Sequence, residues 1–236
     1  MKKLFGLSFT ALIIALSTLQ VGVTSCKKEV TKYDTVTIIN TDTLLVESVD
    51  TVFAMDVAKW DAYSFLTDAL VAPGATTYMN TGEGIKLVAQ ATRYGLRLQT
   101  KKEIGIKDKT IYFKWKANGQ GDFAHFVIQL KYDPTETDAL PPVQNIDFPA
   151  FSTKNAVNGS YVIANDTWYY TRIRAIPGTD KYQFVTATGN YDNNGGTMIV
   201  DKEVPVYTKH GYLSFRIGDT FSASTYLVIA EARIAS

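Results

Sequence analysis

The chain has 236 residues, with 24 lysines and arginines against 23 aspartates and glutamates, and a formal net charge of +1. A chain this close to neutral lacks the basic surface that nucleic-acid-binding proteins carry, so the sequence predicts no nucleic-acid partner. It contains a single cysteine, which excludes an internal disulfide and a metal site built from several thiolates.

The amino terminus has the three regions of a secretory signal peptide, predicted to span residues 1–25. Lys2 and Lys3 give a positive start, and the strongly apolar centre at 11–16 is shorter than the ~20 residues of a membrane-spanning helix. The sequence Val-Thr-Ser-Cys ending at Cys26 resembles the lipobox of bacterial lipoproteins. This resemblance implies cleavage before Cys26, acylation of its sulfur and anchoring to the bacterial outer membrane.

Two alternatives are an ordinary secretory signal followed by an incidental cysteine and a short transmembrane anchor. Cys26 is the only cysteine and stands where a lipobox requires it, which favours a lipoprotein. Cleavage removes Lys2 and Lys3 but no acid, so the formal charge of the mature chain falls from +1 to −1. Several acyl chains hold a protein at a membrane without a polybasic segment.

Residues 26–52 are predicted to form an extended stalk. Three triplets repeat at a spacing of eight: Asp34-Thr35-Val36, Asp42-Thr43-Leu44 and Asp50-Thr51-Val52. Threonine and valine favour extended backbone, and the segment lacks the glycine and proline of flexible linkers. The alternative is that this segment pairs with another chain, or with the domain as an added strand.

The same triplets resemble the O-glycosylation acceptor motif of periplasmic and surface proteins of the Bacteroidota. On this resemblance, Thr35, Thr43 and Thr51 are predicted glycosylation sites. Lys27-Lys28-Glu29, directly after the cysteine, partly resembles the charged surface-export signal of that phylum and predicts display at the cell surface.

Residues 53–236 provide enough chain for one domain with a sizeable core. Many short segments alternate apolar and polar residues, which predicts strands with one buried face. The predicted strands are 84–90, 94–100, 111–115, 123–132, 161–164, 168–175, 182–185, 197–200, 213–217 and 225–234. Turn-forming sequences separate several of them, at 118–121, 177–180 and 193–196. The pattern predicts an all-β fold, an antiparallel β-sandwich of the jelly-roll type.

Two segments are less regular. Residues 56–70 place apolar side chains at near-helical spacing, with Asp56 as a cap, but Tyr63 and Phe65 also alternate with polar residues as in a strand. Helix and irregular first strand both remain open. The proline-rich segment 133–159 is predicted to be a long loop or a cap over one sheet edge, where binding sites often lie.

Several strand motifs resemble the concanavalin A-like jelly roll of laminarinase-type glycoside hydrolases. They are Gly95-Leu96-Arg97-Leu98-Gln99-Thr100-Lys101-Lys102 followed by 111–116, and Trp168-Tyr169-Tyr170-Thr171-Arg172 followed by 181–184. The resemblance implies this fold, with the final strand returning beside the first. Those hydrolases carry Glu-x-Asp-x-x-Glu on one strand, whereas the only Glu-x-Asp here, Glu136-Thr137-Asp138, has proline at 141. The departure removes the carboxylate pair that hydrolysis needs and implies a binding scaffold.

The sequence gives little support for other catalytic sites or for metal sites. His125 lies on the polar side of a predicted strand and His210 precedes a glycine in a turn, and neither stands in a triad or zinc motif. Asp192-Asn193-Asn194 offers oxygen ligands in a turn, so calcium at Asp192 is one interpretation. A polar hairpin turn is the other.

Aromatic residues are the most suggestive feature, at 12% of the chain. Tyrosine and tryptophan stack on the apolar faces of sugars while their polar ends form hydrogen bonds. Trp168 and Tyr170 share one strand face and Tyr169 takes the other, so at least one aromatic residue should be exposed. The candidate carbohydrate-binding residues are Trp60, Trp168, Tyr170, Tyr191, Asn193 and Asn194. The alternative is that the aromatic side chains all pack in the core.

The function favoured by the sequence is non-catalytic carbohydrate binding by a lipid-anchored jelly-roll domain that holds polysaccharide at the cell surface. A structural or assembly lipoprotein with an outer-membrane protein partner is the first alternative. A glycan hydrolase with an unrecognised carboxylate pair is the second. An exposed aromatic strip favours carbohydrate binding, a flat apolar patch favours the protein partner, and carboxyl groups ~5–9 Å apart favour the hydrolase.

Overall fold

The computed structural model describes residues 51–64, 67, 69–89, 95–120, 125–131, 145–154, 159–206, 210–218 and 224–236. Cys26, Thr35, Thr43 and the triplet at 136–138 lie outside these ranges, so the predictions made for them stay predictions. Within the described ranges, no helix has the length and apolar character needed to cross a membrane.

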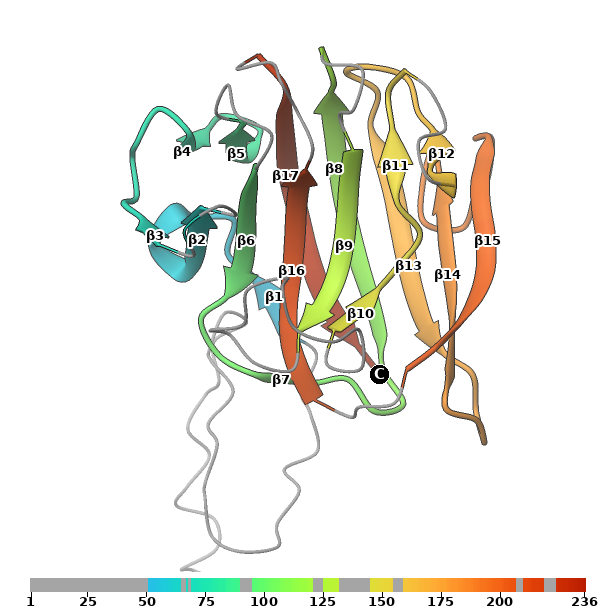
Figure 1. Cartoon of the computed structure of the whole chain (residues 1–236). Coiled ribbons are helices and arrows are strands. Elements are labelled where there is room, and N and C mark those ends of the chain that lie inside the picture. Colours follow the sequence, from blue (N-terminus) through green and yellow to red (C-terminus); the bar gives the residue numbers. More distant parts are fainter. Residues whose placement is uncertain are drawn as a thin grey trace, which may run out of the picture. The chain divides into compact units, whose positions relative to one another are not determined.

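The described residues form two packed sheets, which we name sheet A and sheet B (Figure 1). Sheet A has the order β15-β14-β13-β8-β17-β5-β4, with β1 also on β17. Its strands are β1 (Thr51–Phe53), β4 (Tyr78–Thr81), β5 (Gly84–Val88), β8 (Thr110–Asn118), β13 (Tyr169–Ala175), β14 (Lys181–Ala187), β15 (Met198–Pro205) and β17 (Tyr226–Ala235).

Sheet B has the order β12-β11-β9-β16-β6-β2-β3, with β10 also on β9 and β7 on β16. Its strands are β2 (Trp60–Ser64), β3 (Leu70–Val71), β6 (Leu96–Thr100), β7 (Ile104–Gly105), β9 (His125–Lys131), β10 (Asn145–Asp147), β11 (Phe151–Ser152), β12 (Tyr161–Val162) and β16 (His210–Gly218). Strand neighbours in both sheets run antiparallel except β11 and β12, which are parallel.

The predicted antiparallel jelly-roll sandwich is confirmed, and each predicted strand overlaps an observed one. For residues 56–70, the sequence allowed either a helix or a strand. The structure has a strand there, β2, and Asp56 caps only a single 3-10 turn, η1 (Val57–Lys59). The described part of the predicted loop 133–159 contains β10 and β11, which both pair with β9. Their backbone hydrogen bonds extend sheet B, which explains why this segment is more than a loop.

The first and last strands meet in sheet A. β1 pairs with the end of β17, with Thr51 opposite Ile234 and Phe53 opposite Ala232. The final strand therefore returns beside the first, as the resemblance implied. Two residues assigned by sequence to the stalk, Thr51 and Val52, belong to this strand.

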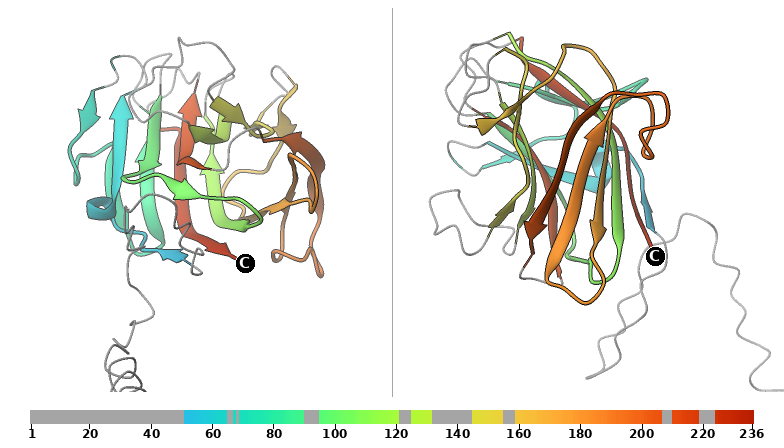
Figure 2. Two further views of the ribbon diagram at one scale, coloured as in Figure 1. Left: turned by 90° about the horizontal axis from the view of Figure 1, so that it is seen from below. Right: turned by 90° about the vertical axis from the view of Figure 1, so that its right-hand side faces the viewer.

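The core lies between the two sheets, which Figure 2 shows as separate layers. β8 buries every second side chain, so Phe113 and Trp115 point inward. The Phe113 ring packs edge-on against Phe215 of β16, with 4.8 Å between ring centroids. Burial of each such side chain contributes about 1.5–3 kcal/mol to folding.

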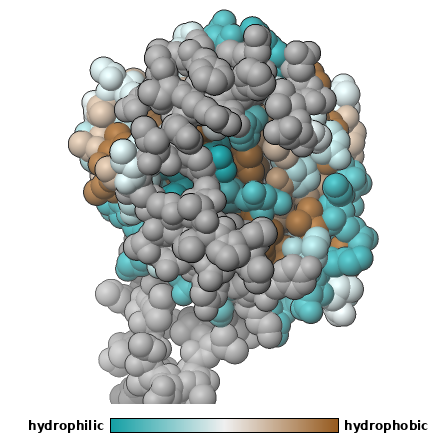
Figure 3. Space-filling view, viewed as in Figure 1, coloured by the Kyte–Doolittle hydropathy of each residue, from teal (hydrophilic) through white to brown (hydrophobic). Residues whose placement is uncertain are grey.

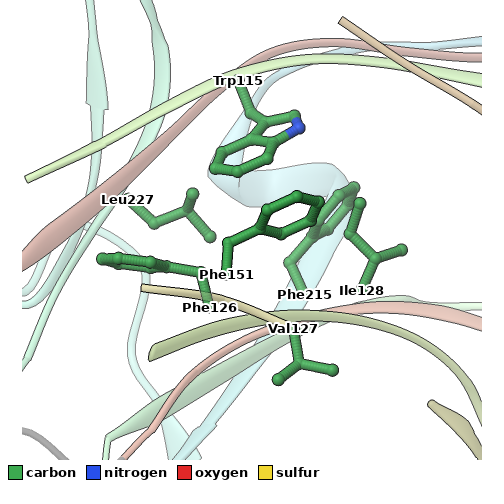
Figure 4. Close-up of a pocket in the computed structure, with 7 residues that line it drawn as sticks. All are labelled: Trp115, Phe126, Val127, Ile128, Phe151, Phe215 and Leu227. Carbon is green, nitrogen blue, oxygen red and sulfur yellow. The ribbon is translucent and has the colours of Figure 1, made fainter. Parts of the chain in front are cut away.

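A small apolar gap remains inside this core (Figure 4). Its lining residues are Trp115, Phe126, Val127, Ile128, Phe151, Phe215 and Leu227. Most of these side chains turn toward one another, whereas Val127 points away. The gap has room for no more than about one water molecule and offers almost no polar atoms. A sugar ring cannot enter this gap, so a binding site for sugar would lie on the surface of the sandwich.

Candidate functional site

The outer face of sheet A collects tyrosines and cations because the strands alternate. β8 and β13 are hydrogen-bonded neighbours, with Lys114 opposite Tyr170 and Tyr112 opposite Arg172. These residues are half-buried, whereas the residues between them in sequence fill the core. Period-two geometry therefore brings two rows of outward side chains together on one face.

Trp168 precedes β13 and lies beside the lysines of β8. Its ring centroid is 4.8 Å from Nζ of Lys116 and 5.0 Å from Nζ of Lys114. The Lys114 ammonium also lies 5.6 Å from the centre of the Tyr170 ring. At these distances an ammonium interacts with the electron-rich ring face, a contact that contributes about 0.5–1 kcal/mol at an exposed site.

Tyr191 joins this face from the turn between β14 and β15. Its ring packs edge-on against Tyr112, at 5.1 Å between centroids, and against Tyr170, at 5.2 Å. The guanidinium of Arg233 lies 3.8 Å from the centre of the Tyr112 ring and 5.4 Å from that of Tyr191. We call Tyr112, Trp168, Tyr170 and Tyr191 the aromatic cluster.

The Tyr191 hydroxyl is buried beside the Glu231 carboxylate and forms no hydrogen bond of good geometry. Burial, followed by the nearby charge of Glu231, raises the pKa of Tyr191 far above its usual range. The phenol therefore stays protonated at all physiological pH values and carries a hydroxyl able to donate. A buried polar group without a well-formed hydrogen bond costs about 1–3 kcal/mol.

Asn190 shapes the turn that presents Tyr191. Its Oδ1 accepts hydrogen bonds from the backbone N–H groups of Asp192 and Asn194, each at 3.0 Å. Asn193 adopts a left-handed backbone conformation, with φ of 58°, which asparagine tolerates better than most residues. The Asp192 carboxylate bonds to the Arg172 guanidinium at 3.1 Å, tying the turn to β13.

This turn does not fit a calcium ion. Calcium takes six to eight oxygen ligands, usually including several carboxylates. Asp192 is the only carboxylate in the turn, and Arg172 already binds it. The described ranges also contain no group of three His, Cys, Asp or Glu residues placed to hold a metal. The observed geometry is that of the polar hairpin turn.

The structure brings together only part of the predicted site. Trp168, Tyr170 and Tyr191 meet on one face, and Asn193 and Asn194 lie in the turn beside Tyr191.

Trp60 is placed differently from the prediction. It is 1% exposed, and its Nε1 donates to the backbone oxygen of Ala54 at 3.0 Å. It packs in the core against Phe53 and Phe215, because it alternates with the polar Asp61 on β2. The buried ring offers no face to a sugar.

Tyr112 is a member of the cluster that the prediction omitted. Its period-two alternation with Phe113 was a usable signal for an outward side chain.

Tyr226 extends the same face. Its ring lies 4.0 Å from Nζ of Lys86, and its hydroxyl donates to Asp166, a bond that raises the pKa of Tyr226 to about 12.

A second polar row, on the side of sheet B that faces away from the core, was not predicted, and its Gln99, Gln129 and Ser214 are buried. Strand register aligns one residue from each of five neighbouring strands: Asp61, Gln99, Ser214, Gln129 and Asp147. Gln129 donates from Nε2 to Asp147 at 2.8 Å, while its Oε1 and the Ser214 hydroxyl are buried without partners. Figure 3 shows that the surface of the described residues is mixed, with hydrophilic residues beside hydrophobic ones.

No protein-family profile and no curated protein sequence matches the chain. Solved structures do match. The lectin UEA-II in complex with galactose is similar over 80% of this chain and 99% of its own, at 10% identity and a TM-score of 0.54. A legume lectin-like domain from Entamoeba histolytica is similar over 81% of this chain and 99% of its own, at 8% identity and a TM-score of 0.53. The VIP36 exoplasmic/lumenal domain bound to Ca2+ and Man3GlcNAc is similar over 78% of this chain and 88% of its own, at 10% identity and a TM-score of 0.51.

These matches extend over almost the whole length of the first two neighbours and most of the third. Identities of 8–10% establish a shared architecture and nothing finer. The chain therefore has the legume-lectin-like, concanavalin A-like jelly-roll fold.

Proposed function

We propose that the chain is a lipid-anchored protein of the cell envelope whose jelly-roll domain binds carbohydrate without catalysis. The observation that carries the proposal is the aromatic cluster on the outer face of sheet A. The legume-lectin-like fold supports it, since two of the similar structures contain galactose or Man3GlcNAc.

The chemistry of the cluster suits a sugar. Half-buried rings present apolar surface to the C–H face of a pyranose, and the surrounding polar atoms are donors and acceptors for its hydroxyls. Trp168 and Tyr170 supply ring surface, and Asn194 in the adjacent turn is exposed. Edge-on packing of Tyr191 against Tyr112 and Tyr170 holds the rings in place, so little conformational entropy is lost on binding.

Binding without hydrolysis is the simplest function for this residue set. Retaining and inverting glycosidases need two carboxyl groups flanking the scissile bond. The aromatic cluster is bordered by Asp192 and Glu231, and each bonds to an arginine, Arg172 and Arg233 respectively. Both carboxylates bordering the cluster are therefore already engaged in ion pairs.

The proposed anchor places this domain at a membrane. Acylation of Cys26 would tether the chain to the outer membrane, and the stalk would lift the sandwich away from the lipid surface. The proposed glycans on Thr35 and Thr43 would keep the stalk solvated, and a glycan on Thr51 would lie on β1 at the start of the domain. A surface-facing orientation gives the domain access to polysaccharide outside the cell.

An outer-membrane protein partner is less well supported. The large hydrophobic residues that are exposed in the described ranges are Val52, Leu70, Val162 and Met198. They belong to four different strands, β1, β3, β12 and β15. Single exposed apolar residues are ordinary on soluble surfaces, whereas a docking surface needs them gathered into a patch.

A glycan-array screen of the acylated chain in detergent tests the proposal. We expect specific binding that Trp168→Ala weakens at least tenfold, which corresponds to about 1.4 kcal/mol. Tyr63→Ala is the matched control, because Tyr63 is a half-buried tyrosine of β2 in the other sheet. Absence of binding across diverse polysaccharides would contradict the proposal. Loss of binding in Tyr63→Ala alone would move the site to sheet B.

A further inference from the structure

Over β5, β8, β13 and β17 the outer face of sheet A is biased toward positive charge, whereas the edge strand β15 adds Asp201 and Glu203. The outward positions of β5, β8, β13 and β17 hold one carboxylate, Glu231, and these cations: Lys86, Lys114, Lys116, Arg172, Arg174 and Arg233. The whole chain is nearly balanced, with 24 basic and 23 acidic residues. The excess is therefore local to the face that carries the aromatic cluster.

Some of these cations already have carboxylate partners. Lys116 bonds to Glu83 at 2.7 Å, and the Glu83 carboxylate comes from the turn between β4 and β5. Arg233 bonds to Glu231 at 3.1 Å. Arg172 bonds to Asp192, but its Nε is buried and has no partner. Lys86, Lys114 and Arg174 form no ion pair within the described ranges of the chain.

Among the cations without an ion pair, Lys114 is the one that contacts the aromatic cluster. It stands opposite Glu231 in the register of β8 and β17, where an ion pair would be expected. Its ammonium instead lies beside the rings of Trp168 and Tyr170. Together with Lys116 it places two positive charges within 5.0 Å of the Trp168 ring centre. A half-buried cation without a counter-ion is costly, and an incoming anion would reduce that cost.

We propose that this face selects anionic polysaccharide, in which sugar rings carrying carboxylate or sulfate groups stack on Trp168 and Tyr170 while Lys114 pairs with the anionic group. This inference rests on the proposed carbohydrate-binding function and adds the class of glycan. The half-buried Arg172 and the exposed Arg174 lie farther along β13 and extend the positive track for a longer chain.

Single-stranded nucleic acid is the other polyanion that uses aromatic rings and cations. The predicted secretory signal favours glycan over nucleic acid.

Affinity electrophoresis of the acylated chain in detergent tests the inference. Gels contain polygalacturonate as the carboxylated polymer, dextran sulfate as the sulfated one, dextran as the neutral one, or single-stranded DNA. We expect retardation by one or both acidic glycans, weakening as salt is raised, and at least tenfold weaker binding by Lys114→Gln. Lys114→Arg should restore binding because it restores the charge. Lys107→Gln, which removes an exposed cation from the turn before β8, should leave binding unchanged.

The variants separate this inference from the proposed function. Binding to neutral dextran that Trp168→Ala abolishes and Lys114→Gln does not change would overturn the anionic class and keep carbohydrate binding. Acidic-glycan binding that Trp168→Ala leaves intact would show simple charge attraction and overturn the inference. Equal retardation by single-stranded DNA would overturn it as well. No retardation in any gel would overturn both proposals, and thermal unfolding of each variant verifies that it is folded.

Discussion

Tyr191→Phe should make the free protein more stable. The substitution removes only the hydroxyl, which is buried and forms no hydrogen bond of good geometry. The ring keeps its edge-on contacts with Tyr112 and Tyr170. An unsatisfied buried hydroxyl costs about 1–3 kcal/mol, so its removal should raise the free energy of unfolding by an amount in that range.

Urea unfolding followed by tryptophan fluorescence measures this change, and thermal unfolding should show a Tm higher by about 2–4 °C for each kcal/mol. Tyr191→Ala is the contrasting variant, because it also removes two ring contacts that contribute about 0.5–1.5 kcal/mol each. It should lose stability. A loss of stability in Tyr191→Phe would refute the reasoning, since it would show that the hydroxyl donates to Glu231 in the free protein.

Further predictions concern the fold, the pH dependence and the anchor. Gly95→Ala should destabilise the domain by about 3 kcal/mol in urea unfolding, because a Cβ there would lie 1.7 Å from the backbone oxygen of Ile217. Gly82→Ala, where a Cβ meets nothing within 4 Å, is the control and should change stability little. Burial raises the pKa of Tyr182 to about 12, so stability that is complete below pH ~10 should fall as the pH rises toward 12, and Tyr182→Phe should flatten that fall. Cys26→Ser should release the chain from the membrane fraction of the native host, and unchanged membrane association would contradict the lipid anchor.

The strands of the sandwich were predictable because period-two alternation reports directly which side of a strand is buried. β8 shows this clearly, since Phe113 and Trp115 point to the core and Tyr112 and Lys114 to the outside. The short strands β1, β3, β4, β7, β10 and β11 were missed. Each has two to four residues, too few to show a clear period, and each exists because a neighbouring strand supplies its hydrogen bonds.

The candidate site was predictable only in part, because its geometry depends on register. Trp60 alternates with Asp61 as in a strand, but helix and strand both fitted the sequence there, so the side that its ring would take was not fixed. Tyr112 and Tyr191 meet through two strand pairings and a turn held by Asn190. The polar row of sheet B draws one residue from each of five strands, so sequence spacing carries no sign of it.

The side-chain N–H signals of the three tryptophans provide the most direct test of a glycan site on the outer face of sheet A. In the core, the indole N–H of Trp60 bonds to Ala54 and that of Trp115 to Thr171, whereas Trp168 lies on the outer face. An NMR titration with an acidic oligosaccharide should shift the Trp168 signal and leave the signals of Trp60 and Trp115 in place. Bound oligosaccharide with an unmoved Trp168 signal, and shifts confined to the backbone of β6 and β16, would contradict the site.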